Sequence, residues 1–398
     1  MTRAVVVIDG EHYAPVVRDA IAELPYNVVG AWLAGGTEKL RGGEDYGVPL
    51  LAELEDGFGR AEVVVDLSDE PVLGPERRLL LASRTLAAGL RYEGADFRFE
   101  PPQYAAFPLP SLAVIGTGKR VGKTAVTGHV AHVLTRDRDV VVVAMGRGGP
   151  AEPVIAEVQP TLDSLLELSR RGEHAASDYV ETAALTGVVT IGCRRAGGGL
   201  AGAVSTSNVL QGAALAVERE PDVVVFDGSG AAIPPIDVDA RVLVSGIGQD
   251  PTSHLNPYRV LISDLVVLIG DEDAERIRRL KDVPVVRAEL RLRPAEPLAG
   301  RRVAVFTTGP APTDHLDAEV AHVSRNLADR ARLREDVAAA DADVYLVEIK
   351  AAAIDVVAEA AQKCGAEVVF AANEVVPLPG EPDLDDAIRR LVPTGARV

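Results

Sequence analysis

Residues 114–130 read VIGTGKRVGKTAVTGHV, and nine of them, GTGKRVGKT, nearly spell a phosphate-binding loop. The loop of nucleotide enzymes has the form G-x-x-x-x-G-K-[ST], in which the lysine reaches the β and γ phosphates and the hydroxyl ligates magnesium. Lys123 and Thr124 stand where the motif requires them, but the first glycine is replaced by Thr117, and Gly116 comes one residue too early. The chemistry indicated is phosphoryl transfer from a nucleotide.

The surroundings of this segment favour a true phosphate loop. Apolar SLAVI before it predicts a strand and AVTGHVAHVL after it predicts a helix, which is the context that the motif demands. Glycines let consecutive N–H groups turn inward around phosphate oxygens, and the helix adds its positive end. The alternative, a glycine-rich turn with two surface lysines, requires Gly-Lys-Thr to fall at this joint by accident. We assign nucleotide binding to Gly116, Thr117, Gly118, Lys119, Arg120, Val121, Gly122, Lys123, Thr124 and Ala125.

A magnesium nucleotide also needs an acidic partner, and PDVVVFDGSG offers one. Asp227 follows four apolar residues and precedes small ones that let a ligand approach the backbone. It can hold the metal directly or through water. The plainer alternative is a strand-end aspartate that caps a turn.

Two further glycine-rich segments carry arginine after a predicted strand. AMGRGGPAEP presents Arg147, and IGCRRAGGGLAG presents Arg194 and Arg195. Guanidinium groups on such turns suit bidentate phosphate recognition, and strand ends of a doubly wound sheet share one edge. Each segment alone could carry surface arginines; together they predict a second anion site. Cys193 has no visible base nearby in sequence, and we interpret it as a small buried residue.

The N-terminal segment places its own polar residues after predicted strands. IDGEHY contributes Asp9, Glu11 and His12, while GGTEKL and VDLSDEP follow the next two strands. Any one of these segments can be an ordinary solvated loop. Collectively they indicate a ligand site or a contact that closes over the nucleotide, and we expect Glu11 and His12 to bind substrate.

Length and composition bound the fold that must position these residues. The 398 residues suggest two or three domains, and the net charge of −18 argues against nucleic acid and anionic membranes as partners. Two distant cysteines and the lack of an apolar run of about 18 to 20 residues favour a cytoplasmic protein.

Short Val/Ile runs alternate with helix-period segments along the whole chain, which predicts βαβ units. Proline-punctuated residues 100–110 and 291–300 indicate boundaries. We therefore expect an α/β protein in which a P-loop NTPase core with a parallel sheet, residues 106–293, is flanked by Rossmann-like α/β domains, residues 1–105 and 294–398. The last of these could instead pack as an extension of another.

The loop is similar to the GTDTxVGKT form of dethiobiotin synthetase and its relatives, except that Gly118 replaces an aspartate that helps to organise magnesium. The resemblance therefore leaves part of the metal role to Asp227 or Glu152. Across nearly its whole length the chain resembles the cyclic 2,3-diphosphoglycerate synthetase family. The family-like motifs, in order, are VVVIDGEHYAPVVRDAI, GGTEKL, IGTGKRVGKTAV, VVAMGRGGPAEP, IGCRRAGGGLAG, VFDGSGAAIPP and VEIKAAAIDVV.

This resemblance implies ATP-dependent closure of an intramolecular phosphoanhydride in 2,3-diphosphoglycerate, with release of ADP and phosphate. Lys123 and Lys119 would act on the transferring phosphoryl group, with Asp227 beside them. Thr124 and Asp227 would hold Mg²⁺, Arg147, Arg194 and Arg195 would hold the substrate phosphates, and Arg120 could serve either ligand. We also expect a homodimer.

Three rival interpretations remain. The nearest is a kinase or ligase with another acceptor, such as 2-phosphoglycerate. A second is a partition-like ATPase switch, although its signature lysine would fall at Gly118. The third, a regulatory module without turnover, leaves the three arginines unexplained.

Overall fold

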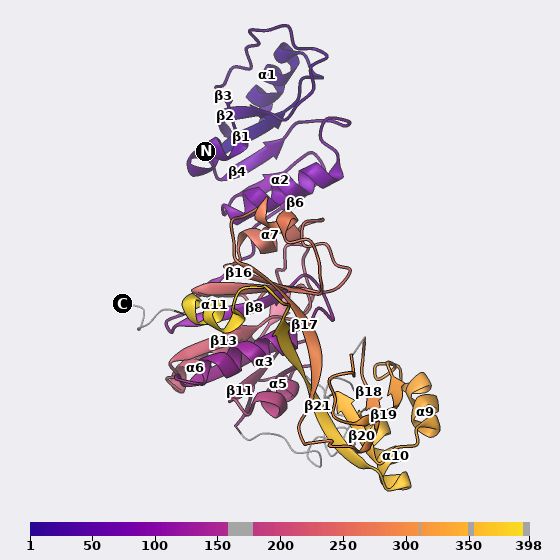
Figure 1. Ribbon diagram of the computed structural model, residues 1–398. Coiled ribbons are helices and arrows are strands. Elements are labelled where there is room, and N and C mark those ends of the chain that lie inside the picture. Colours follow the sequence, from indigo (N-terminus) through magenta and orange to yellow (C-terminus); the bar gives the residue numbers. More distant parts are fainter. Residues whose placement is uncertain (158–177, 310–311, 349–353, 393–398) are drawn as a thin grey trace. The chain divides into compact units, whose positions relative to one another are not determined.

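The computed structural model describes residues 1–157, 178–309, 312–348 and 354–392 (Figure 1). The chain divides into two compact units. The first contains Met1–Gln103, Asp250–Ile262 and Glu275–Asp282, and the second contains Tyr104–Gln249, Ser263–Ala274 and Val283–Val398.

The first unit is built on a six-stranded sheet in the order β3-β2-β1-β4-β5-β6, parallel except for the β5–β6 pair. Its aliphatic runs predict strands that are buried on both faces, and the five residues 4–8 are indeed fully buried. The strands are β1 Arg3–Ile8, β2 Asn27–Leu33, β3 Leu50–Leu51, β4 Val63–Asp66, β5 Arg91–Glu93 and β6 Arg98–Phe99. The helices are α1 Ala14–Glu23, the 3₁₀ helix η1 Leu54–Arg60, α2 Pro75–Ala87, α7 Asn256–Leu261 and α8 Glu275–Arg278.

The second unit contains a 13-stranded sheet in the order β10-β11-β9-β13-β8-β15-β16-β17-β21-β20-β18-β19, with β12 paired to β11. Its strands are β8 Ser111–Gly116, β9 Val140–Gly146, β10 Val154–Ala156, β11 Thr190–Ala196, β12 Thr206–Ser207, β13 Val223–Asp227, β15 Ala240–Ser245, β16 Leu265–Ile269, β17 Val285–Pro294, β18 Arg302–Phe306, β19 Glu319–Ser324, β20 Val344–Glu348 and β21 Glu367–Pro377. A small second sheet pairs β7 Ala105–Ala106 with β14 Ile236–Asp237. The helices are α3 Lys123–Leu134, α5 Asp178–Thr186, α6 Val209–Glu218, α9 Arg330–Ala339, α10 Ile354–Cys364 and α11 Leu384–Leu391.

The centre of this sheet is parallel and carries the phosphate-loop strand. β9, β13, β8, β15 and β16 all run the same way, so their carboxyl ends share one edge. Helix α3 packs on this sheet through apolar residues that include Val126 and Val130. The α/β class and the parallel phosphate-loop core are therefore confirmed.

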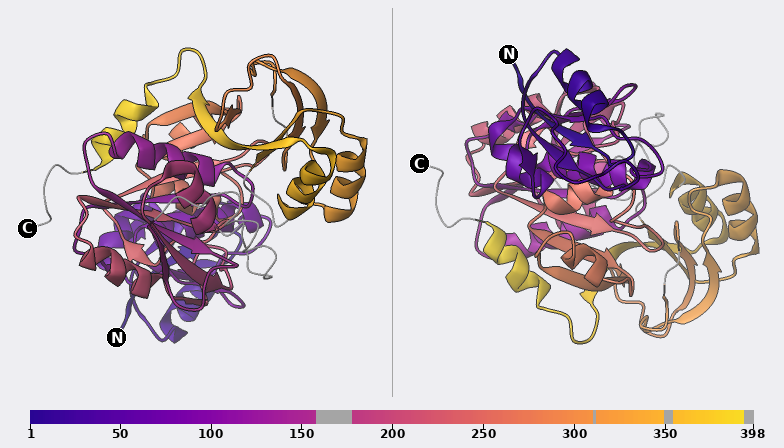
Figure 2. Two further views of the ribbon diagram at one scale, coloured as in Figure 1. Left: turned by 90° about the horizontal axis from the view of Figure 1, so that it is seen from below. Right: turned by 90° about the horizontal axis from the view of Figure 1, so that it is seen from above.

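Two long strands join this core to the C-terminal strands. β17 pairs with β21 in antiparallel register from Ala288↔Pro377 to Pro294↔Ala371, and β21 then pairs in parallel with β20. Figures 1 and 2 show β17 and β21 side by side, leading from the core to β18, β19 and β20. The sheet is thus continuous across residue 294, where we expect a boundary. Within the described residues, no helix has both the length and the apolar character needed to span a membrane.

Candidate active site

The segment GTGKRVGKT forms the turn between β8 and α3. Gly122 precedes the helix with a φ of +88°, a conformation that favours glycine, and Arg120 takes a φ of +58°. At Gly116 a side-chain carbon would lie 3.0 Å from Val121 Cγ2 and 3.2 Å from Gly230 O. The glycine at 116 therefore lets neighbouring backbone approach, although it stands one residue early for the motif.

Thr117, which replaces the expected glycine, anchors the start of the loop. Its N–H donates to Val244 O at 3.1 Å, and its hydroxyl donates to Gln249 Oε1 at 2.7 Å. Both partners belong to β15 or to the turn after it, more than 120 residues along the chain. The threonine side chain thus makes a contact that a glycine could not make, which accounts for the altered motif.

Lys123 and Asp227 form a buried ion pair at the centre of the site. Lys123 Nζ lies 2.5 Å from Asp227 Oδ1, and the two side chains are only 8% and 0% exposed. Thr127 Oγ1 donates to the same oxygen at 3.0 Å. Removing one member of such a pair leaves a buried charge alone, at a typical cost of about 3–5 kcal/mol.

The other oxygen of Asp227 fits the predicted metal role. Asp227 Oδ2 is buried and has no hydrogen-bond partner among the described residues. Buried carboxylate oxygens are nearly always satisfied, and magnesium is commonly held by one or two carboxylates together with substrate phosphates. Thr124, half-buried in the first turn of α3, directly follows Lys123. These residues are therefore suited to Mg²⁺.

Arg147, Arg195 and Lys119 come together around Gly230, three residues after Asp227. A side-chain carbon at position 230 would lie 3.0 Å from Arg147 Nη2, 3.7 Å from Arg195 Nη2 and 3.7 Å from Lys119 Cγ. Gly230 has a φ of +59°, a left-handed conformation that favours glycine. Because glycine has no side-chain carbon, Arg147 can approach the backbone at this position. Three cationic side chains from three separate segments thus meet at Gly230, in the turn that follows Asp227.

Arg194 is oriented differently from Arg195. Both are in β11, where successive side chains point to opposite faces, and Arg195 is buried while Arg194 is exposed. Arg195 donates to Gly197 O at 2.7 Å and to Ser229 O at 2.8 Å. The structure therefore brings Arg195, but not Arg194, to Gly230, and a substrate contact by Arg194 stays a prediction.

Two further predicted residues are exposed. Arg120 is exposed in the loop, and Glu152 is exposed between β9 and β10. Within the part of the chain that the structure describes, no hydrogen bond or ion pair joins Glu152 to Thr124 or Asp227. Residues 349–353 of the last family-like motif lie outside the described residues.

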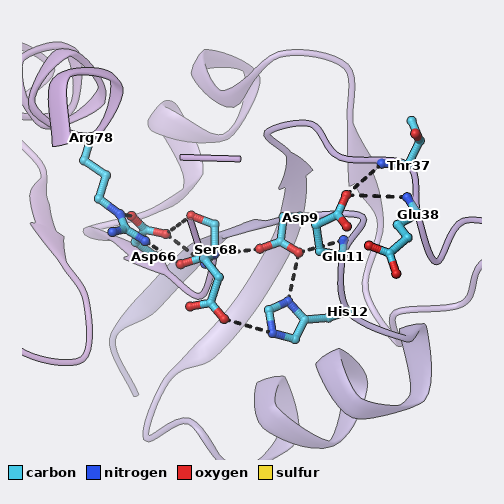
Figure 3. Close-up of polar contacts among 9 residues, drawn as sticks. Asp9, Glu11, His12, Thr37, Glu38, Asp66, Ser68 and Arg78 are labelled. Atoms are coloured by element: carbon cyan, nitrogen blue, oxygen red, sulfur yellow. Dashed lines mark hydrogen bonds and ion pairs between the residues drawn. The ribbon is translucent and has the colours of Figure 1, made fainter. Parts of the chain in front are cut away.

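Glu11 and His12 belong to the first unit, at the carboxyl end of β1 (Figure 3). Asp9 is fully buried there. One of its oxygens accepts from Glu11 N at 2.9 Å and lies 2.8 Å from His12 Nδ1, and the other accepts from Asp69 N at 2.7 Å. Burial by itself would raise the pKa of Asp9, but these hydrogen bonds together lower it below its usual value.

Side chains around Asp9 are also held by contacts within the same unit. Glu11 Oε1 accepts from Thr37 N at 3.1 Å, and His12 Nε2 lies 3.4 Å from Asp69 Oδ2. Asp66 pairs with Arg78 at 3.0 Å (Figure 3). The predicted loops of the three strands thus do meet at one edge, whereas a substrate role for Glu11 and His12 stays a prediction.

Cys193 is buried, as expected. Burial raises the pKa of its thiol to about 12, which keeps it protonated at neutral pH. A side-chain carbon on Gly212 would lie only 2.3 Å from Cys193 Sγ, so α6 packs directly against this sulfur. The geometry gives it a packing role.

Sequence reasoning missed three residues of the site. Thr127 had a signal, because it is four residues after Lys123 and so falls on the same face of the helix. No sequence pattern indicates Gln249 or Gly230. Gln249 matters because it contacts Thr117, and Gly230 because three cationic side chains that are distant in sequence meet there.

Comparison with known proteins gives one consistent family. Three family models match this chain. They describe the N-terminal domain (residues 3–100 of this chain), the P-loop domain (residues 111–289) and the C-terminal domain (residues 294–374) of cyclic 2,3-diphosphoglycerate synthetase. The cyclic 2,3-diphosphoglycerate synthetase of Rubrobacter xylanophilus is 47% identical, covering 99% of this chain and 98% of that protein. The synthetase of Thermococcus kodakarensis is 41% identical, covering 97% and 98%. Among solved structures, LpxK from Aquifex aeolicus aligns with a TM-score of 0.43 and 15% identity, covering 73% of this chain and 90% of LpxK.

Proposed function

Because the chain belongs to the cyclic 2,3-diphosphoglycerate synthetase family, we propose that it uses ATP to close a phosphoanhydride ring in 2,3-diphosphoglycerate. The observation that supports this most directly is that the second unit contains two sets of residues suited to binding anions. The loop with Lys123 and Asp227 suits a triphosphate, and the cations around Gly230 suit a second polyanion beside it.

The reaction is written in two steps that balance. In the first, an oxygen of one substrate phosphate bonds to the γ-phosphorus of ATP, and the bond from that phosphorus to ADP breaks. In the second, an oxygen of the other substrate phosphate attacks the phosphorus of the first, and inorganic phosphate leaves. The products are ADP, phosphate and a cyclic anhydride. Phosphates are already ionised near neutral pH, so no strong general base is needed.

The residues of the site would perform the following work. Lys123 leaves Asp227 for the β and γ phosphates, because phosphate oxygens offer it more negative charge than one carboxylate. Arg147 and Arg195 hold the substrate phosphates against mutual repulsion, and removing one such contact typically costs about 3 kcal/mol. Lys119, whose side chain lies beside theirs at Gly230, acts with Lys123 on the transferring phosphoryl group. Asp227 and Thr124 are the residues that would hold Mg²⁺, which neutralises charge on the transferring phosphoryl group. We rank Glu152, Arg120 and Arg194 below these residues.

Phosphorus NMR tests the proposal. The protein is incubated with Mg-ATP, with and without 2,3-diphosphoglycerate, and we expect a new pair of pyrophosphate resonances only when both substrates are present. A parallel sample with 2-phosphoglycerate tests the kinase alternative. ATP turnover that does not depend on an acceptor and yields no new phosphorus species would contradict the synthetase proposal and favour a switch. The homodimer and the cytoplasmic location stay predictions of the sequence.

A further inference from the structure

Thr127 is a polar residue on the buried side of α3. The structure describes the whole of this helix, and its buried residues are alanine, valine and leucine except for Lys123 and Thr127. Thr127 is fully buried. Burying a hydroxyl is unfavourable unless it makes a hydrogen bond, and valine would fill nearly the same space without that cost. The hydroxyl therefore needs a specific partner.

The partner of Thr127 is the carboxylate of Asp227. Thr127 Oγ1 donates to Asp227 Oδ1 at 3.0 Å, and Lys123 Nζ lies 2.5 Å from the same oxygen. The two donors are four residues apart in α3 and so lie on one side of the helix. Asp227 Oδ2 has no partner among the described residues. The helix thus holds one oxygen of the carboxylate, and the other oxygen is left to a ligand.

The backbone of Asp227 has little freedom, so the side chain decides where its oxygens point. Asp227 is in register with Val114 of β8 on one side and with Ala144 of β9 on the other. The last torsion of an aspartate side chain has broad energy minima, so it does not by itself fix the carboxylate. Hydrogen bonds to Oδ1 are therefore what fix the orientation of Oδ2.

The two donors to Oδ1 differ in whether they can stay there when a nucleotide binds. Lys123 has a long, flexible side chain, and the proposed function moves its charge to the β and γ phosphates. The hydroxyl of Thr127 is attached directly to Cβ of a branched side chain, whose first torsion is restricted, so its range of movement is small. Once Lys123 has moved, Thr127 is the donor of this pair that remains on Oδ1.

We propose that Thr127 is the positioning residue of Asp227. It holds Oδ1 after Lys123 has moved to the phosphates, and so keeps Oδ2 available to the Mg²⁺ that accompanies ATP. This inference rests on the proposed use of Mg-ATP and adds a residue that acts through Asp227. Loss of the hydroxyl should weaken the contribution of the metal to nucleotide binding and leave the contribution of the loop unchanged.

Calorimetric titration with the non-hydrolysable β,γ-imido analogue of ATP, in the absence of any acceptor, tests this directly. Each protein is titrated once with Mg²⁺ and once with EDTA, and the factor by which Mg²⁺ lowers the Kd measures the contribution of the metal. For Thr127→Val we expect this factor to fall about tenfold, because one hydrogen bond to a charged group is lost, while the Kd in EDTA stays within about twofold of wild type. Thr127→Ser keeps the hydroxyl and should keep most of the factor.

Thr85→Val is the matched control. Thr85 is a fully buried threonine of α2 in the first unit, and its hydroxyl has no hydrogen-bond partner among the described residues. This substitution also replaces a buried hydroxyl with a methyl group, and it should change neither Kd. Thr127→Ala removes the hydroxyl without putting a methyl group in its place, and it provides the same test if Thr127→Val does not fold.

Three results would overturn the assignment. One is a Thr127→Val variant in which Mg²⁺ lowers the Kd by the same factor as in wild type. Another is a variant whose Kd rises equally with Mg²⁺ and with EDTA, which would limit Thr127 to packing α3. The third is a wild-type protein whose affinity gains nothing from Mg²⁺, which would also contradict the metal role of Asp227. Because no acceptor is present, a failure of the proposed synthesis leaves all three results readable.

Discussion

Each of the two units has a buried aspartate at the carboxyl end of a parallel strand, and the two aspartates differ in how completely their oxygens are hydrogen-bonded. Asp9 directly follows β1 and Asp227 ends β13, and both side chains are fully buried at the carboxyl end of a parallel strand. Both oxygens of Asp9 have partners, from Glu11, His12 and Asp69. Asp227 instead keeps one oxygen without a partner among the described residues and gives the other to Lys123 and Thr127.

The difference teaches how to separate a structural carboxylate from one that binds a ligand. The contacts of Asp9 are made by its own loops and are complete, so the charge stabilises that edge of the fold. The contacts of Asp227 are incomplete, and leaving a buried polar atom unsatisfied typically costs about 1–3 kcal/mol. Such a cost is expected where binding of a ligand restores the missing interaction. Burial and position alone do not distinguish the two cases.

The largest effect that this comparison predicts is at Lys123. Lys123→Ala removes the cation that would bind the transferring phosphoryl group and leaves Asp227 as a buried charge. We expect turnover to fall by about 10³-fold or more, by analogy with loss of a single transition-state donor, as measured by ADP release. Lys363→Ala, an exposed lysine in α10, is the control. Activity of Lys123→Ala within tenfold of wild type would show that the Lys123–Asp227 pair is structural, like the contacts of Asp9.

The second prediction compares two exposed arginines of the second unit. Arg147→Ala removes a cation next to Gly230, and we expect the KM for the diphosphoglycerate substrate to rise about 30-fold while the KM for ATP changes little. Arg194→Ala should raise the KM for the same substrate by about threefold or less, because that side chain leaves β11 on the other face. Steady-state kinetics with each substrate varied in turn measure both. Equal effects of the two variants would contradict this ranking.

The sequence predicted the local part of this organisation well. The loop, its flanking strand and helix, and Asp227 at a strand end all depend on residues that are close together in the chain. The convergence of Lys119, Arg147 and Arg195 on Gly230 could be predicted only as a shared sheet edge, because strand order is not encoded in periodicity. Residue contacts across more than 100 positions, such as Thr117 with Gln249, could not be predicted from spacing.

The linker expected at residues 291–300 shows the same limit, whereas the domain boundary at residues 293–294 stays a prediction. The segment RLRPAEPLAG is rich in proline and looks like a linker, but β17 includes its first four residues. Pro294 is the last residue of β17 and still lies opposite Ala371. The antiparallel partner β21 lies about 80 residues later, and no local pattern indicates that pairing.

The third prediction concerns Asp9. Asp9→Asn offers one acceptor oxygen where the aspartate has two, and we expect the free energy of unfolding to fall by about 1–3 kcal/mol with an unchanged affinity for ATP. The pKa of Asp9 is lowered in the folded state, so its contribution is present above the unfolded pKa and is lost as pH falls through the folded one. Urea unfolding from pH 7 to pH 3 measures both, with Asp19→Asn, an exposed aspartate in α1, as the control. If the variant lost affinity for ATP but kept its stability, Asp9 would be a ligand-binding carboxylate and not a structural one.

The smallest expected effect concerns a third aspartate, Asp385. Like Asp9, it has partners for its carboxylate within the protein, so we expect it to be structural. Asp385 in α11 lies 2.9 Å from His129 Nε2 and 2.7 Å from Arg136 Nη1, so its carboxylate, like that of Asp9, is paired with side chains of its own unit. Burial lowers the pKa of His129, although Asp385 and Glu374 oppose this and Arg136 adds to it. The unfolded chain therefore takes up the proton first, and His129 makes stability fall as pH drops below its unfolded value of about 6.5. Unfolding of His129→Gln should show a shallower decline between pH 7 and pH 5 than wild type. An equal or steeper decline in the variant would mean that the Asp385 pairing, and not burial, controls this histidine.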